Sequence, residues 1–532
     1  MSKRVAAFYS IFMVCLLLLV TNLYRLSTGN QLAEAADRQS SYRLTVASGR
    51  GTVYDTNLKP LTGTEIGYTA VVNPTPETAS ILADVLPRER MEEVYTLLTK
   101  GKPFLLTLPK AVQAEGIDTF ETYRRYNTND QIAANVIGYL DGSNIGVAGM
   151  EKAYQDYLSA DPGGITVSYR VDAVNRVLSG ENKEIKDTSE KNKKGVVLTL
   201  DEEIQKIAEK SAKKYLKKGA VVVTEVPSGK IRAMVSLPDF SPTDLKSAMD
   251  NPDSPLMNRA ISAYSVGSVF KVVSAAAALE SGVSPDTTFT CTGGIEVGGG
   301  VYHCFNGKAH GKLNMQGAIA HSCNSYFVRL MQQIPNETLL KMAQSLGFGQ
   351  SQSFAPGYTT AAGSLPEQKE LLVPRALANF SFGQGKLSAT PVQIAGLINA
   401  VASGGLYTPP SLVEGLVDDK MQYVERAKST EAVRVMSQDT AAQLRQFMGA
   451  AVEEGTAKKG KPVLGGAGIK TGTAQTGQYV GNKEVEQGWY AGFFPLNTPR
   501  YSIVVLSEDA QGASDGAPVF QEIANALLSK TN

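Results

Sequence analysis

The first residues in this sequence that could carry chemistry are a serine and a lysine three positions apart, Ser268 and Lys271. They follow Gly267 at the start of an apolar run that predicts a helix over residues 269–279, which would place both side chains on one helix face. A serine hydroxyl is a weak nucleophile unless a base lies beside it, and a lysine amine is such a base when burial and nearby positive charge keep it neutral. The start of a helix adds a positive potential and a free backbone N–H, which suit an oxyanion. The pair is therefore a candidate for nucleophilic acyl transfer. Alone the pattern is weak, because Ser211 and Lys214 have the same spacing and are better explained as the solvated face of an amphipathic helix.

Two further polar groups occur later in the chain. Ser322 and Asn324 flank Cys323 in a short polar break between two helical runs, and a predicted strand carries Lys470, Thr471, Gly472 and Thr473. Taken alone, the first group could be a helix cap and the second an exposed edge strand. Together with the serine–lysine pair, and in this order, they form the three-part set of penicillin-recognising enzymes.

The chain resembles the class B penicillin-binding proteins, monofunctional peptidoglycan transpeptidases, over most of its length. The other segments that carry the resemblance are residues 50–55, Arg125-Tyr126, 133–139, Gly149-Met150-Glu151, 198–201, 258–260, 382–385 and Thr390-Pro391 with Gln393. The resemblance implies an α+β penicillin-binding fold, a central antiparallel sheet with helices. A membrane anchor and an elongated mixed α/β pedestal domain would precede it.

The resemblance also assigns catalytic roles. Ser268 would attack the carbonyl of a D-alanyl-D-alanine stem peptide, and Lys271 would remove the proton of its hydroxyl. Ser322 would relay a proton to the leaving nitrogen, and Asn324 would hold Lys271 and the substrate amide.

Substrate binding would fall to the third group. Lys470 would set a positive potential, Thr471 and Thr473 suit the substrate carboxylate, and Gly472 between them belongs to the same set. The backbone N–H groups of Ser268 and Thr473 would form the oxyanion hole. The reaction needs no metal or organic cofactor. The implied partners are peptidoglycan stem peptides, β-lactam antibiotics and a glycan polymerase of the SEDS family.

Other functions predict other features. A D,D-carboxypeptidase or a β-lactamase-type hydrolase of the same superfamily would deacylate rapidly, and a β-lactamase would not need the pedestal. A receptor signalling through acylation of Ser268 would need a substantial cytoplasmic part, yet only Met1 to Arg4 precede the apolar segment. A structural wall-binding protein would not need all three motifs. Neither the cellular process nor the acceptor amino acid can be assigned from the residues.

The N-terminus predicts a single-pass anchor in a bacterial cell membrane. Lys3 and Arg4 precede an apolar stretch over residues 5–24, about the length that crosses a bilayer. Basic residues before the stretch predict a cytoplasmic N-terminus and an extracytoplasmic catalytic domain. A cleaved signal peptide is the alternative, with the small-x-small site at residues 33–35.

The length and composition indicate an ordinary globular protein of more than one domain. The chain has 532 residues, 43% hydrophobic and 19% charged, and a net charge of +1, which excludes the strongly basic surface that nucleic acid requires. We expect the anchor at residues 1–25, the pedestal at 26–194 and the transpeptidase domain at 195–532. The Lys-, Glu- and Asn-rich residues 179–194 predict a linker or exposed loop.

Local patterns predict the elements of the last domain. A strand at 196–200 is followed by a helix capped by Asp201, and a hairpin joins residues 220–226 to 230–235. A helix over 392–401, with Thr390 as its N-cap, ends an all-helical middle. The predicted strands at 466–473, 489–494 and 501–506 and a helix at 519–528 complete it.

Three of the four cysteines and all three histidines lie between Cys291 and Cys323. Cys291, Cys304, His310 and Cys323 are ligands of the types that zinc prefers, with His303 and His321 as substitutes. Cys291 and Cys304 could instead form a disulfide in an oxidising exterior, or all the thiols could be free. The sequence leaves these three states open.

Overall fold

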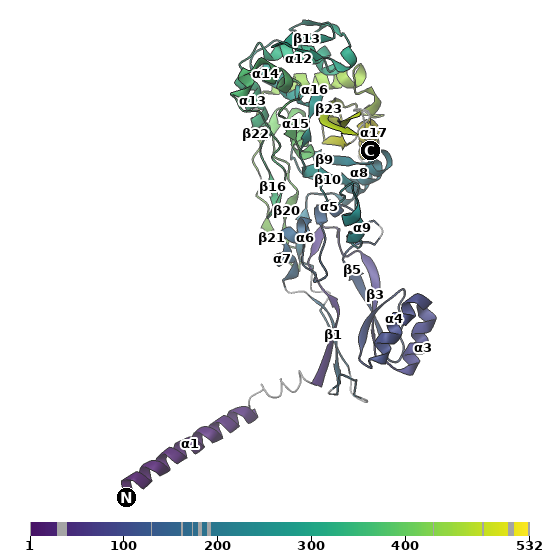
Figure 1. The fold of residues 1–532 in the computed structure, drawn as a ribbon, viewed down its shortest axis with the longest axis vertical. Coiled ribbons are helices and arrows are strands. Elements are labelled where there is room, and N and C mark those ends of the chain that lie inside the picture. The colour runs from purple at the N-terminus through teal and green to yellow at the C-terminus, as the bar shows by residue number, and fades with distance from the viewer. Residues whose placement is uncertain are drawn as a thin grey trace. The chain divides into compact units, whose positions relative to one another are not determined.

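The computed structural model describes residues 2–28, 40–128, 130–160, 163–172, 174–178, 183–188, 193–428, 430–480, 483–508 and 515–529 (Figure 1). The chain forms two compact units. The first comprises Met1–Arg50, Glu65–Arg124 and Asp161–Asn192, and the second comprises Gly51–Thr64, Arg125–Ala160 and Lys193–Asn532. The sequence-based division at residues 194 and 195 remains a prediction of domain organisation. The second unit also includes two stretches from before that division.

The first unit contains two three-stranded antiparallel sheets, ordered β1-β6-β7 and β4-β3-β5. Its elements are α1 (Ser2–Thr28), β1 (Ser41–Ser48), β3 (Glu65–Val72), α3 (Pro76–Val85), α4 (Arg88–Thr99), β4 (Phe104–Leu108), β5 (Ile117–Arg124), β6 (Gly164–Arg170) and β7 (Glu184–Asp187). Helices α3 and α4 bury Leu82, Met91 and Val94 against the second sheet. Thr75 caps α3 in a reciprocal capping box with Thr78.

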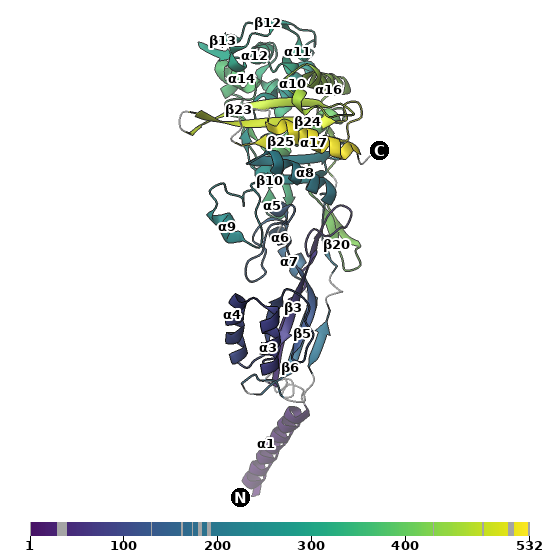
Figure 2. The same ribbon diagram turned by 90° about the vertical axis from the view of Figure 1, so that its right-hand side faces the viewer.

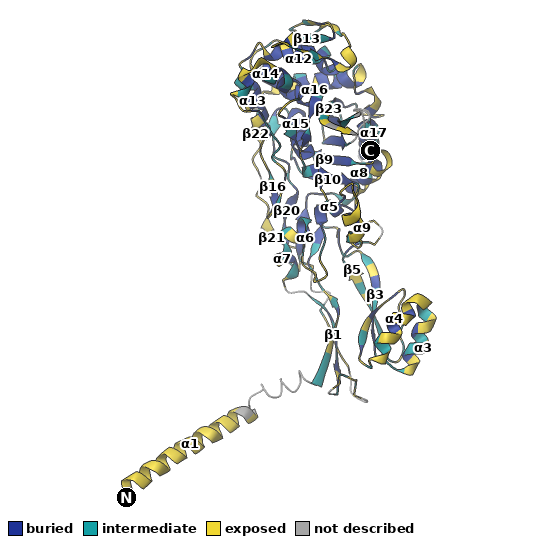
Figure 3. Cartoon of the chain, viewed as in Figure 1, coloured by how far each residue is buried: buried dark blue, intermediate teal, exposed yellow. Residues whose placement is uncertain are grey.

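Helix α1 is, among the described residues, the helix that is long and apolar enough to cross a membrane. Its segment Lys3–Arg25 has a mean hydropathy of 2.2, and its described side chains are exposed along the whole helix (Figure 3). An exposed apolar helix of this length is unfavourable in water and suits the hydrocarbon core of a bilayer. The alternative cleavage site at residues 33–35 lies outside the described residues.

The second unit is built around a five-stranded antiparallel sheet in the order β10-β9-β25-β24-β23. The sheet and its covering helices are β9 (Gly219–Glu225), β10 (Ile231–Leu237), β23 (Gly468–Val480), β24 (Lys483–Phe494), β25 (Tyr501–Ser507), α8 (Glu202–Tyr215), α10 (Lys271–Glu280), α15 (Pro391–Ala402), α16 (Gln438–Glu453) and α17 (Gly516–Ser529). The remaining helices are α5 (Ala134–Ile137), α6 (Gly149–Ala153), α7 (Gln155–Ser159), α9 (Leu245–Asp250), α11 (Met315–Ala320), α12 (Asn324–Met331), α13 (Asn336–Ser345) and α14 (Pro374–Ser381), with short 3-10 turns η2 (Arg259–Ile261), η3 (Gly267–Phe270), η4 (Phe305–Gly307), η5 (Glu370–Leu372) and η6 (Lys458–Gly460). The remaining strands are β2 (Thr52–Tyr54), β8 (Gly195–Leu198), β11 (Tyr264–Ser265), β12 (Phe289–Cys291), β13 (Gly294–Val297), β14 (Gly300–His303), β15 (Gly311–Leu313), β16 (Ser353–Ala355), β17 (Tyr358–Thr359), β18 (Ser388–Ala389), β19 (Leu406–Tyr407), β20 (Val413–Val417), β21 (Tyr423–Arg426) and β22 (Val433–Arg434).

Both faces of the central sheet are covered, so its strands are apolar on both sides. Val221 and Val223 of β9 belong to a core shared with α8 and α17, the two helices lying across the sheet in Figure 2. Ala220 and Val222 of the same strand face the opposite core, shared with α10 and α15. Because alternate β9 side chains face opposite cores, α10, which begins at Lys271, lies on one defined face of the sheet.

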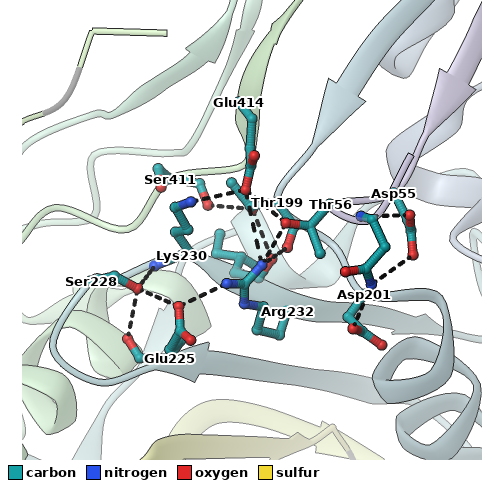
Figure 4. Close-up of polar contacts among 12 residues, drawn as sticks. Asp55, Thr56, Thr199, Asp201, Glu225, Ser228, Lys230, Arg232, Ser411 and Glu414 are labelled. Carbon is teal, nitrogen blue, oxygen red and sulfur yellow. Dashed lines mark hydrogen bonds and ion pairs between the residues drawn. The ribbon is translucent and has the colours of Figure 1, made fainter. Parts of the chain in front are cut away.

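Polar side chains connect the early segment Gly51–Thr64 to the rest of the second unit (Figure 4). Arg232 of β10 donates to Thr56 Oγ1 at 2.9 Å, to the Thr199 carbonyl at 3.0 Å and to Glu225 Oε2 at 2.8 Å. Glu414 accepts from Thr56 Oγ1 at 2.8 Å. Strand β2 also pairs in parallel with β8. Two segments far apart in sequence are thereby fixed side by side.

A second buried network joins three segments that carry the resemblance described above, around residues 51, 125 and 151. Arg125 donates from Nε to Glu151 Oε1 at 2.6 Å and from Nη1 to the Gly51 carbonyl at 2.7 Å. Tyr126 donates its hydroxyl to the same Glu151 oxygen at 3.1 Å. Because the Glu151 side chain is fully buried, its charge depends on these donors.

Many of the predicted elements are confirmed. Asp201 caps α8, and its side chain accepts from Glu203 and Ile204 backbone N–H groups. Thr390 caps α15 in a capping box with Gln393. The hairpin of β9 and β10 and the strand β25 lie where the patterns place them.

Three predictions are wrong in part. The middle of the last domain is not all helical, because short strands such as β12 to β15 pair with one another there. These strands have three or four residues, too few to carry a periodic signal. Residues 184–187, within the predicted linker, form β7, which pairs with β6. Strands β23 and β24 also extend beyond their predicted ends, because they pair along a polar hairpin.

Candidate active site

The predicted nucleophile lies in a tight turn held by the neighbouring sheet. Ser268 is in the 3-10 turn η3, and α10 begins at Lys271. The strand just before the turn is fixed by two β24 side chains. Trp489 donates Nε1–H to the Ser265 carbonyl at 2.8 Å, and Gln487 Oε1 accepts the Ser265 N–H at 2.8 Å. The backbone that leads into Ser268 therefore has defined partners.

The amine of Lys271 lies at the centre of the site. Its Nζ is 2.9 Å from Ser268 Oγ, 2.6 Å from Asn324 Oδ1, 2.8 Å from the Ser322 carbonyl and 3.1 Å from Ser322 Oγ. A neutral amine has two N–H groups and one lone pair. With the N–H groups on the Ser322 carbonyl and the Asn324 side chain, the lone pair is left for the Ser268 hydroxyl. That arrangement makes Lys271 a general base for Ser268.

Ser322 joins the two lysines of the site. Its Oγ is 3.1 Å from Lys271 Nζ and 3.0 Å from Lys470 Nζ. Its backbone has a φ of 56°, in the left-handed region that non-glycine residues rarely adopt. A strained backbone held at such a position is typical of functional sites, because the surroundings must compensate for it. With this left-handed backbone, both the carbonyl and the hydroxyl of Ser322 lie toward Lys271.

Burial lowers the pKa of both lysines. Lys271 and Lys470 have no exposed surface, and burial lowers the pKa of Lys271 from 10.5 to about 7. Burial, and then repulsion from Lys271, holds the pKa of Lys470 well below its ordinary value. A charged amine is disfavoured away from water, so the fold itself produces the neutral base that the chemistry needs.

Three glycines bring the nucleophile turn against its neighbours, and we call Gly267, Gly383 and Gly472 the glycine contact. A Cβ on Gly267, which has a φ of 62°, would lie 2.7 Å from the Thr473 carbonyl oxygen. A Cβ on Gly383 would lie 1.9 Å from the Gly267 carbonyl oxygen, and one on Gly472 would lie 3.0 Å from Val269 Cγ2. The Gly267 N–H also donates to the Gly383 carbonyl at 2.9 Å. Side chains are excluded here so that β23 can approach the turn.

The third motif has one partner that sequence reasoning missed. Thr471 Oγ1 is 2.8 Å from Thr456 Oγ1, in the segment after α16. Lys470 donates to the Thr471 carbonyl at 2.7 Å. Thr456 fixes the hydroxyl of Thr471, yet it lies in a lysine-rich stretch with no motif of its own, so only the folded chain reveals it.

The structure brings the predicted site residues together. Ser268, Lys271, Ser322, Asn324 and Lys470 form one connected set of polar contacts. Thr471, Gly472 and Thr473 continue along β23 beside η3. A nucleophile, a base, a shared hydroxyl and a strand edge in this arrangement can perform acyl transfer on a substrate bound along β23.

The chain is similar in sequence and fold to known proteins. Residues 219–529 match the family model described as the penicillin binding protein transpeptidase domain. Stage V sporulation protein D of Bacillus subtilis is 28% identical over 517 residues, covering 91% of this chain and 78% of that protein. The peptidoglycan D,D-transpeptidase PbpA of Mycolicibacterium smegmatis is 33% identical over 341 residues, covering 58% of this chain and 67% of that protein. The solved structure of penicillin binding protein 3 from Mycobacterium tuberculosis with aztreonam has a TM-score of 0.66 and 25% identity, covering 92% of this chain and 97% of that one.

Proposed function

The chain belongs to the penicillin-binding protein transpeptidase family, and on that premise we propose that Ser268 is the nucleophile of a peptidoglycan D,D-transpeptidase. The observation that carries the proposal is the 2.9 Å contact between Ser268 Oγ and a fully buried Lys271 amine. A relative named as a D,D-transpeptidase and a related fold solved with a β-lactam support the same activity. The protein is a serine-type acyl transferase that binds peptidoglycan stem peptides and β-lactams.

Acylation begins when Lys271 takes the proton of Ser268 and the serine oxygen attacks the carbonyl of the penultimate D-alanine. The backbone N–H groups of Ser268 and Thr473 receive the oxyanion. Collapse of the tetrahedral adduct breaks the amide bond. The leaving nitrogen of terminal D-alanine takes a proton from Lys271 through the Ser322 hydroxyl, which lies between the two lysine amines.

Deacylation completes the cross-link. An amine from a neighbouring stem peptide attacks the ester carbonyl, its proton passes to Lys271, and the Ser268 oxygen leaves and recovers its proton. Asn324 keeps Lys271 in place through both steps by its 2.6 Å contact. Thr471 and Thr473 bind the substrate carboxylate on β23. Its negative charge favours the charged form of Lys470 against the burial that lowers the pKa of this amine, and Lys470 then supplies a positive potential for the carboxylate.

We further propose that α1 anchors the protein in a bacterial cell membrane as a single pass. Lys3 and Arg4 at the start of α1 favour a cytoplasmic N-terminus and an extracytoplasmic catalytic domain. The transpeptidase acts on stem peptides carried by glycan strands, so a lipid-linked glycan polymerase of the SEDS family is the partner we expect. Edman sequencing of the mature protein from cells tests the anchor: retention of the first residues supports it, and a start at Ala36 would replace it by a cleaved signal.

Labelling with a fluorescent penicillin tests the nucleophile. The full-length protein in detergent is expected to form a lasting covalent adduct, located at Ser268 by mass spectrometry of its peptides. Ser268→Ala removes the adduct, and Ser281→Ala, at the far end of α10, is the matched control that keeps it. An adduct on Ser322, or normal labelling of Ser268→Ala, would disprove the assignment. Rapid loss of the adduct would favour the hydrolase alternative.

A further inference from the structure

Four side chains from separate segments meet beside the active site, and the mechanism uses none of them. Cys291 ends β12, Cys304 follows β14, His310 precedes β15 and Cys323 precedes α12. One ligand atom from each of the four lies within 4.8 Å of every other. The three cysteines are buried and His310 is half-buried.

The separations between these atoms are those of a tetrahedral metal site. Cys291 Sγ lies 3.6 Å from Cys304 Sγ, Cys304 Sγ lies 3.8 Å from Cys323 Sγ, and Cys291 Sγ lies 3.5 Å from His310 Nδ1. Zn–S bonds of about 2.3 Å and Zn–N bonds of about 2.0 Å at tetrahedral angles give S–S edges of about 3.8 Å and S–N edges of about 3.5 Å. The cluster has the dimensions of a zinc site with three sulfur ligands and one nitrogen ligand.

The surroundings of the sulfurs suit thiolates. The Gly293 N–H donates to Cys291 Sγ at 3.4 Å, and the Ser325 hydroxyl lies 3.6 Å from Cys304 Sγ. Donors to ligand sulfurs orient them and stabilise the negative charge that a metal requires. His310 also has a neighbour, because the His321 ring stacks on it with centroids 6.3 Å apart.

A disulfide fits the cluster less well. The three thiols are free, and Cys304 lies at nearly equal distances from Cys291 and Cys323. A disulfide would bond one pair at about 2.05 Å and leave the third sulfur and His310 without a function. The tetrahedral arrangement uses all four side chains.

The cluster is connected to the catalytic residues through the chain itself. Cys323 lies between Ser322 and Asn324, whose side chains both contact Lys271. Asn324 also donates Nδ2–H to the carbonyl of His303, the residue before Cys304, at 2.8 Å. A metal bound by Cys304 and Cys323 would therefore hold the Ser322–Asn324 loop from both ends.

We propose that Cys291, Cys304, His310 and Cys323 bind one structural Zn²⁺ ion that fixes the loop carrying Ser322 and Asn324. All four positions are protein side chains, as in structural rather than catalytic zinc sites. The ion takes no part in acyl transfer, and its contribution is to hold the strained Ser322 backbone in place. The proposal goes beyond the transpeptidase function, since metal content is measured without any substrate.

Metal analysis of the full-length protein, purified in detergent without a histidine tag and dialysed in metal-free buffer, tests the site. We expect about one zinc per chain in the wild type and less than about 0.1 in Cys291→Ser and in His310→Ala. Cys15→Ser, at the exposed cysteine of α1, is the matched control and keeps its zinc. Wild-type protein with less than about 0.1 zinc per chain after incubation with Zn²⁺, or with a disulfide in its alkylated peptides, overturns the proposal.

A second measurement tests the connection to the loop without any substitution. A chelator is applied to wild-type protein, and the acylation rate with a fluorescent penicillin is followed before and after Zn²⁺ is returned. Since a displacement of about 1 Å in a site costs up to about 100-fold, acylation is expected to fall by about 10- to 100-fold and to recover with Zn²⁺ but not with Mg²⁺. Unchanged acylation by zinc-free protein would overturn the role of the ion in holding the loop, whereas failure of the transpeptidase proposal would show as no acylation in either state.

Discussion

The rate of acylation is expected to rise with pH as Lys271 loses its proton. Burial lowers the pKa of Lys271 to about 7, and only the neutral amine can take the Ser268 proton. With that value, about 9% of the amine is neutral at pH 6 and about 91% at pH 8, which gives a rise of about tenfold. An unburied lysine, titrating near pH 10.5, would give a rate still climbing by about tenfold per unit at pH 9.

The assay measures the second-order rate constant for acylation by a fluorescent penicillin at constant ionic strength. The full-length protein in detergent is held at each pH between 5.5 and 9.5 while circular dichroism checks that it stays folded, and return to pH 7.5 with full recovery excludes irreversible inactivation. The rate is expected to rise through a midpoint near pH 7 and to level off above about pH 8. Lys271→Ala should acylate several orders of magnitude more slowly at every pH, because base and nucleophile act as a unit.

A histidine could produce a similar midpoint, so one control is needed. His321 lies near the site, and burial lowers its pKa from the ordinary value of 6.5. His321→Gln is expected to keep the rise near pH 7. Loss of the rise in this variant, a rate independent of pH between 6 and 9, or a midpoint above about 9 would refute Lys271 as the titrating base.

Three further outcomes are expected. Glu151→Ala leaves the buried Arg125 charge without its carboxylate and should lower the free energy of unfolding in urea by about 3–5 kcal/mol. A loss below about 1 kcal/mol would show that the network is not a buried ion pair. Gly383→Ala places a Cβ 1.9 Å from the Gly267 carbonyl oxygen and should abolish penicillin labelling while circular dichroism stays native, so normal labelling would contradict the close contact. Thr390→Ala removes the N-cap of α15 and should cost about 1 kcal/mol, seen as a lower thermal midpoint with acylation retained at low temperature; an unchanged midpoint would argue against the cap.

The elements that the sequence predicts well are those specified by local chemistry. A side chain such as Asp201 caps its helix through bonds to the next few residues, and Pro391 after Thr390 begins a helix by the same short-range logic. The hairpin at Pro227-Ser228-Gly229 is equally local. Such patterns need no knowledge of the rest of the fold.

The elements that the sequence predicts poorly depend on distant partners. Strand β7 is rich in charge and exposed, and it forms because β6 offers it an edge. The short strands β12 and β15 pair across an intervening hairpin of β13 and β14. Pairing over such separations leaves no periodic trace in three or four residues.

The active site divides in the same way. The types and order of the motif residues identify Ser268, Lys271 and Ser322 as candidates, since each motif is a short run. Their separations, the left-handed backbone of Ser322 and the hydroxyl contact of Thr456 arise only when four segments fold together. The cysteine–histidine cluster shows the same limit. The sequence supplies its members, and the fold supplies the spacing on which the zinc proposal rests.

The glycine contact also restricts how β-lactam resistance can evolve in this protein. Any larger residue at Gly267, Gly383 or Gly472 would push a Cβ into the backbone or side chains that hold the nucleophile turn. Such a change would exclude the drug and the stem peptide alike, because both must reach Ser268 beside the same strand. Resistant alleles that preserve wall synthesis must therefore alter residues around this contact, where drug and substrate differ in shape.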